Sequence, residues 1–247
     1  MSEAKKTKLL GQGTWITIGS PIITELVANY PFDWLLFDME HGYLTENSLM
    51  GNMQAVRRSE IKQIVRVPSL NPAFIARVLD WGASGIMMPH VSSSEQAMAC
   101  VDAMRYPPYG NRGYSGQVRS FKYGLKTPTD IESINPPLLV VQIEDYEGVL
   151  NAEAIAQVNG VDVLFIGPSD LKLDLSARNG ATLEFKEAIK IVADAANKCQ
   201  KQAGILVKNI RDIPEYTKLG YSCLAIDSDL GILRNGYQSI IAKIKNL

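Results

Sequence analysis

The sequence predicts a closed (β/α)8 barrel, and two observations support this fold class. Short apolar runs alternate eight times with longer amphipathic segments along the 247 residues, as buried parallel strands alternate with crossover helices. A doubly wound sheet would instead require a glycine-rich nucleotide loop after its first strand. The sequence Gly11-Gln-Gly13 lacks the third glycine and precedes its expected strand. We therefore expect one barrel domain over residues 1–247.

The expected strands are short, and most contain β-branched residues, which is typical of strands covered on both faces. They span residues 15–19, 34–39, 63–67, 85–89, 138–144, 161–167, 204–208 and 223–227. The expected helices span residues 21–29, 46–58, 72–80, 93–104, 147–157, 182–200, 211–219 and 230–246. Capping residues mark several helix starts, such as Thr45 before Glu46.

One connection is much longer than the others. Residues 106–135 are rich in glycine and proline and exceed the usual length of a connection within a barrel. Long ordered connections often act as lids, so we expect this segment to cover the barrel mouth.

Charge and composition exclude several classes of partner. With 25 Lys and Arg against 26 Asp and Glu residues, the net charge of -1 provides no broad positive field for nucleic acid or an anionic membrane. Residues 1–15 contain no apolar stretch long enough for a signal peptide, and nowhere do 18 apolar residues follow one another, so we expect a cytoplasmic protein with small-molecule partners. Cys100, Cys199 and Cys223 have no metal-site or disulfide spacing and are expected to be core thiols.

Polar residues cluster at the carboxyl ends of the expected strands, where barrels of this kind carry their active sites. They are Asp38, Glu40, His41, Arg66, Gln142, Glu144, Gly167, Ser169 and Asp170. Glu144 and Asp170 end neighbouring strands, and such a pair suits a hard divalent cation such as Mg2+ or Mn2+. Alternatively, each carboxylate caps a helix or pairs with an arginine.

The cationic residues also allow two interpretations. A buried charge on Arg66 is costly unless it meets an anion, which favours a functional role. His41 is either a base oriented by Asp38 or a structural histidine. For His90 the structural interpretation is favoured, whereas Lys208 raises the alternative of Schiff-base catalysis if its surroundings are apolar.

Several spaced motifs resemble the HpcH/HpaI family of metal-dependent, class II 2-oxo acid aldolases, in the expected barrel order. They are FDWLLFDMEHG (32–42), RVP (66–68), RVLDWGASGIMMPHV (77–91), RYPPYGNRG (105–113), QIE (142–144) and VDVLFIGPSDL (161–171). The resemblance covers nearly the whole chain and implies a barrel of the phosphoenolpyruvate/pyruvate type.

The resemblance implies a role for each candidate residue. Glu144 and Asp170 correspond to the ligands of a divalent metal, Mg2+, Mn2+ or Co2+, and His41 oriented by Asp38 corresponds to the acid/base pair. Asp80 corresponds to a catalytic residue that reaches a neighbouring subunit's site. The implied substrate-binding residues are Arg66, Gln142, Gly167, Pro168, Ser169 and Leu206.

The implied reaction is a reversible retro-aldol cleavage of a 4-hydroxy-2-oxo acid, such as a 2-keto-3-deoxy sugar acid. It gives an aldehyde and a pyruvate enolate held by the metal and Arg66. Decarboxylation of a 2-oxo diacid such as oxaloacetate is the alternative on the same site, and a non-catalytic barrel is a third possibility. The chain departs from the family after Leu171, so the aldehyde stays open.

The family also forms trimers or hexamers in which the last helix packs on a neighbouring subunit. Residues 230–246 carry an apolar stripe that fits such a role or covers the chain's own barrel.

Overall fold

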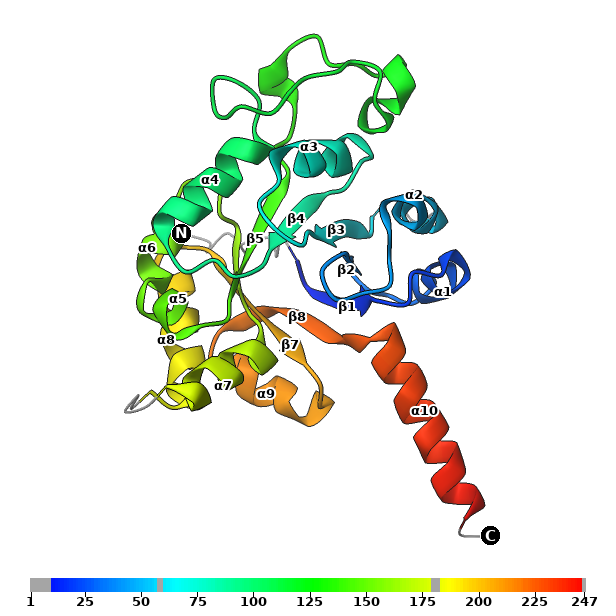
Figure 1. The fold of residues 1–247 in the computed structure, drawn as a ribbon, viewed down its shortest axis with the longest axis vertical. Helices are drawn as coiled ribbons and strands as arrows, with labels where there is room; N and C mark the ends of the chain where they lie inside the picture. Colours follow the sequence, from blue (N-terminus) through cyan, green and yellow to red (C-terminus); the bar gives the residue numbers. More distant parts are fainter. Residues whose placement is uncertain (1–9, 57–59, 179–182, 246–247) are drawn as a thin grey trace, which may run out of the picture.

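The computed structural model describes residues 10–56, 60–178 and 183–245, and these residues form a closed parallel barrel (Figure 1). The strands pair in sequence order, and β8 returns to β1. They are β1 (Gln12–Ile16), β2 (Trp34–Asp38), β3 (Lys62–Arg66), β4 (Gly85–Met88), β5 (Leu138–Ile143), β6 (Val163–Ile166), β7 (Gln202–Val207) and β8 (Tyr221–Ser228). The predicted fold class is confirmed.

The first strand begins earlier than the sequence indicates, at Gln12 rather than residue 15. Gly13 lies inside this strand, where a Cβ atom would come within 2.3 Å of the Trp34 ring. The glycine therefore admits the indole into the barrel. Its position in the strand corrects the prediction that Gly11-Gln-Gly13 precedes it.

Helices surround the barrel. They are α1 (Pro21–Val27), α2 (Glu46–Ala55), α3 (Pro72–Asp80), α4 (Ser94–Met104), α5 (Tyr146–Leu150), α6 (Ala152–Gln157), α7 (Pro168–Ala177), α8 (Phe185–Lys198), α9 (Ile213–Lys218) and α10 (Asp229–Ile244). The expected helix at 147–157 is divided into α5 and α6, and α7 was not predicted. The predicted helix ends at 58, 182 and 246 lie outside the described residues.

Alternate strand residues fill two apolar layers, as the barrel geometry requires. The inner layer includes Trp15, Trp34, Ile64, Val140 and Phe165, all buried inside the barrel. The outer layer joins the strands to the surrounding helices. The inward-facing rows end at the carboxyl ends of the strands, so they determine which side chains reach the barrel mouth.

The long segment 106–135 connects α4 to β5 and contains two 3-10 helices, η1 (Arg119–Gly124) and η2 (Ile131–Ser133). A connection from a helix to the next strand reaches the amino end of that strand, here Leu138. The prediction that this segment covers the mouth is therefore wrong, because the mouth lies at the opposite, carboxyl ends. Figure 1 shows the segment in green above α3 and α4.

The last helix projects away from the barrel instead of packing along it (Figure 1). Only its first residues are buried, whereas Ile232, Tyr237, Ile240 and Ile244 are each at least half exposed. Among the described residues, no helix combines the length and apolar character needed to cross a bilayer.

Candidate active site

Most of the predicted site residues come together at the carboxyl ends of the strands. Asp38 and Arg66 are the last residues of β2 and β3, and the register of these strands pairs them directly. Glu144 follows β5, and Gly167 lies between β6 and α7. Closure of the barrel thus brings residues that are far apart in the sequence together in one polar mouth.

Arg66 is held at the centre of this mouth by two carboxylates. Its Nε and Nη2 atoms donate to Asp38 Oδ1 and Oδ2 at 2.9 and 2.7 Å, and Nη1 lies 2.9 Å from Glu40 Oε2. The guanidinium also stacks over the Trp15 ring, 4.3 Å from its centroid. Because the Arg66 side chain is only 5% exposed, these contacts fix its position and compensate its burial.

The Asp38 carboxylate lies against Arg66 and against the main chain of the following turn. Asp38 Oδ1 accepts the backbone N–H of His41 at 3.2 Å. The imidazole of His41 is largely exposed, and its Nε2 atom is 3.7 Å from Glu40 Oε1. Asp38 is therefore linked to His41 through the backbone, and Glu40 is the carboxylate next to the ring.

Glu144 is buried at the end of β5 and has a raised pKa, chiefly because burial disfavours its charged form. The negative charges of Asp170 and Glu40 raise this pKa further, whereas the His90 N–H opposes the rise. Glu144 Oε2 accepts a hydrogen bond from Gln142 Nε2 at 3.1 Å. A divalent cation bound between Glu144 and Asp170 would relieve the repulsion, so the donor set fits a metal.

Two protein carboxylates would leave the other metal positions to water and substrate. Within the described chain, no three His, Cys, Asp or Glu side chains converge on one metal position. A cation held by two carboxylates would keep positions for a ligand, as catalytic metal ions do.

His90 belongs to the mouth, a position that sequence reasoning left without a role. Its backbone N–H donates to Glu144 Oε1 at 2.8 Å, and its ring lies 3.1 Å from that oxygen and 3.4 Å from Glu40 Oε1. The residue adopts a left-handed conformation with φ of 53°. Such a conformation costs free energy in a non-glycine residue and is typical of functional sites. The place of His90 just after the end of β4 was the sequence signal that could have indicated a role in the site.

The helix α7 begins directly at the predicted carboxylate-binding loop. Pro168 occupies its first turn and Asp170 follows, which are the signals that could have predicted the helix. A Cβ atom on Gly167 would lie 2.4 Å from Glu144 Oε2, so a glycine is needed for this close approach. The amides of Ser169 and Asp170 therefore lie at a helix amino terminus, which favours anions.

Leu206 and Lys208 come from the carboxyl end of β7. Leu206 packs against the inner layer, and Lys208 Nζ donates to Ser169 Oγ at 3.1 Å. Lys208 is exposed. The apolar surroundings required for a Schiff-base lysine are thus not met.

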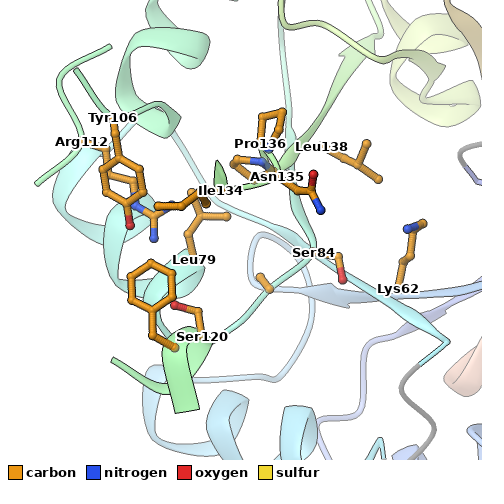
Figure 2. Close-up of a pocket in the computed structure, with 13 residues that line it drawn as sticks. Lys62, Leu79, Ser84, Tyr106, Arg112, Ser120, Ile134, Asn135, Pro136 and Leu138 are labelled. Atoms are coloured by element: carbon orange, nitrogen blue, oxygen red, sulfur yellow. The ribbon is translucent and has the colours of Figure 1, made fainter. Parts of the chain in front are cut away.

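Asp80 lies away from this mouth, at the end of α3 and at the opposite side of the barrel. Its Oδ1 atom accepts from Arg112 Nη2 at 2.6 Å, and Arg112 stacks on Tyr106. Figure 2 shows Arg112 and Tyr106 at one side of a cavity of about 390 Å³, with Ser84 and Lys62 towards the other. Asp80 therefore does not contribute to the mouth formed by its own chain.

The sequence profile of the HpcH/HpaI aldolase/citrate lyase family matches residues 12–236. A 5-keto-4-deoxy-D-glucarate aldolase from Klebsiella pneumoniae is 37% identical over 94% of this chain and 91% of its own length. A family protein from Burkholderia cenocepacia superposes with a TM-score of 0.86 at 27% identity, over 96% and 95% of the two chains. The citrate synthase SbnG gives 0.81 at 25% identity, over 96% and 94%. Because the family profile matches residues 12–236 and a relative is 37% identical over nearly the whole chain, the chain belongs to the HpcH/HpaI aldolase/citrate lyase family.

Proposed function

We propose that the protein is a class II aldolase, a carbon–carbon lyase that cleaves a 4-hydroxy-2-oxo acid to pyruvate and an aldehyde. The observation that carries the proposal is the buried Arg66 beside two acidic pairs, Asp38 with Glu40 and Glu144 with Asp170. The Klebsiella pneumoniae relative acts on a keto-deoxy sugar acid, which supports a 2-keto-3-deoxy sugar acid as the substrate class here.

Glu144 and Asp170 are the residues that would hold the divalent metal, Mg2+, Mn2+ or Co2+. When bound, this cation would polarise the 2-oxo group as a Lewis acid. The remaining steps depend on the protein's own groups. The amides of Ser169 and Asp170 bind the substrate carboxylate, while Gln142, Gly167, Pro168 and Leu206 shape the pocket around the pyruvyl unit.

Arg66 donates to the 2-oxo oxygen and stabilises the negative charge that develops there as the C3–C4 bond breaks. Its fixed position between Asp38 and Glu40 means that little reorganisation accompanies this step. His41 removes the proton of the 4-hydroxyl group, and its exposed ring can reach a substrate that enters from solvent. The aldehyde leaves as the C3–C4 bond breaks, and one proton added at C3, which balances the proton taken by His41, completes pyruvate.

A second candidate is decarboxylation of a 2-oxo diacid of the oxaloacetate type. The similarity to the citrate synthase SbnG supports this second candidate, because the name of that protein shows that a similar barrel carries out a reaction other than aldol cleavage. Both reactions pass through an enolate, so the same residues serve either one. Release of carbon dioxide from oxaloacetate, measured beside cleavage of 2-keto-3-deoxy sugar acids, separates the two.

The experiment that tests enolate formation is exchange of the pyruvate methyl protons in D2O, followed by NMR. We expect no exchange with the metal-free protein and rapid exchange once Mg2+, Mn2+ or Co2+ is added, because the methyl protons become acidic only when the 2-oxo group is polarised. Absence of exchange with every metal, in folded protein, would contradict the proposed function. Exchange that persists in EDTA would contradict the metal requirement.

We also propose that the protein is a homo-oligomer, a trimer or hexamer in which α10 packs on a neighbouring subunit. The exposed apolar face of α10 supports this, as does an apolar cavity of about 380 Å³ between α1 and the start of α10. In such an assembly, Asp80 of one subunit would complete the site of another.

Replacing Ile240 and Ile244 together by glutamate is expected to dissociate the oligomer, because two charges would enter an apolar interface. Sedimentation velocity measures the outcome. Ser239→Glu, on the opposite face of the same helix, is the matched control and should leave the assembly intact. A wild-type protein that sediments as a monomer would contradict the proposal.

A further inference from the structure

Lys208 is the residue that continues the inward-facing row of β7 into the mouth. Gly204 faces the inside of the barrel, since a Cβ atom there would lie 2.5 Å from the Phe165 ring. Leu206, two residues on, also packs against the inner layer. The alternation of strand residues therefore directs Lys208 to the same side, and its ammonium reaches Ser169 on the neighbouring α7.

In residues 10–56, 60–178 and 183–245, no carboxylate pairs with the Lys208 ammonium. Arg66, the other cation of the mouth, already pairs with Asp38 and Glu40. Within the described parts of the chain, the Lys208 ammonium donates to the Ser169 hydroxyl, 3.1 Å away, and forms no ion pair. An ammonium group without a carboxylate partner among the described residues thus lies beside the first turn of α7, where the helix dipole adds further positive potential.

We propose that Lys208 binds a carboxylate of the substrate and acts together with Ser169 at the start of α7. This role rests on the proposed function and makes Lys208 a determinant of the substrate's acidic groups. Because the ammonium contacts the residue whose amide faces the pyruvyl carboxylate, the C1 carboxylate is the favoured partner. A carboxylate on the aldehyde half is the other source of the same chemistry.

The test compares wild-type protein with Lys208→Met and Lys208→Arg. Calorimetry gives the pyruvate Kd with and without Mg2+, and methyl-proton exchange gives KM and the saturated rate. We expect Lys208→Met to weaken pyruvate binding and raise KM about 5- to 20-fold, a modest effect because the ammonium is exposed. The saturated exchange rate should change less than about twofold, since Lys208 does not contact the reacting carbon. Lys208→Arg should retain most of the affinity.

Lys218→Met is the matched control, because it removes an exposed lysine from α9, the helix that follows β7, at its far end. A second measurement identifies the source of the carboxylate, by comparing aldol addition of pyruvate to glyoxylate and to glycolaldehyde. If Lys208→Met leaves pyruvate binding intact but impairs only the reaction with glyoxylate, Lys208 binds the aldehyde half. If neither pyruvate affinity nor glyoxylate preference changes, the inference is overturned.

Failure of the proposed function is distinguishable from failure of this inference. A wild-type protein that exchanges no methyl protons with any metal, yet binds pyruvate in a Lys208-dependent way, would refute the aldolase and keep the carboxylate site. A wild-type protein that binds no pyruvate with or without Mg2+ would overturn both.

Discussion

Replacing Arg66 by lysine is expected to lower the saturated rate of pyruvate methyl exchange about 100- to 1000-fold, the range found when one donor to a developing oxyanion is lost. Lysine keeps the positive charge, but its ammonium lacks the planar, forked geometry of a guanidinium. It cannot contact Asp38 and Glu40 together and also donate to the substrate. The loss should appear chiefly in the saturated rate, because the interaction strengthens as charge develops on the substrate oxygen. NMR exchange at saturating pyruvate and metal measures it.

The Arg66→Ala variant is expected to be less stable as well as inactive. Removal of the guanidinium leaves Asp38, which is 2% exposed, without its ion pair, and such losses cost about 3–5 kcal/mol. Urea unfolding measures this loss of stability. Because the alanine variant combines lost activity with lost stability, the lysine variant is the better test of catalysis. Arg105→Lys, at the opposite end of the barrel near Asp162, is the control for an arginine substitution. An Arg66→Lys rate within twofold of wild type would remove Arg66 from the mechanism.

Replacing Glu144 by glutamine is expected to have opposite effects on metal binding and on stability. The amide keeps an acceptor for the His90 N–H but removes one of two negative charges that would hold the cation. We expect Mn2+ affinity to fall at least about 100-fold, since one of two carboxylate ligands is lost, and exchange to be lost with it. Mn2+ binding followed by electron paramagnetic resonance is a readout independent of activity.

The same substitution should leave the metal-free protein as stable as wild type, or more stable. Burial disfavours the charged form of Glu144, so its pKa is raised, and a neutral amide avoids this penalty. Asp162→Asn is the matched control, because Asp162 also has a raised pKa through burial and accepts a backbone N–H, from Leu139, at the other end of the barrel. Unchanged Mn2+ affinity in Glu144→Gln, or an equal loss in Asp162→Asn, would contradict the metal assignment.

Local patterns were sufficient to predict the barrel and the candidate residues at its mouth. The alternation of apolar runs and amphipathic segments is a property of neighbouring residues, and so are the polar residues that end each strand. The ends of the strands were predicted less accurately, as the early start of β1 shows. Glycine is more typical of turns than of strands, and only the packing of Trp34 against Gly13 explains its place in β1. The helix α7 was missed although Pro168 marked its start.

The sequence by itself determined the fold class. It also placed several acidic residues, together with the cations Arg66 and Lys208, at the ends of strands. Only the tertiary structure decided their partners: the register of β2 and β3 gives Asp38 to Arg66, and the left-handed His90 lies between Glu40 and Glu144. It also placed the 106–135 segment at the amino ends of the strands and left α10 unpacked. The physical reason is that periodicity acts over a few residues, whereas partners and pKa shifts depend on groups that barrel closure brings together.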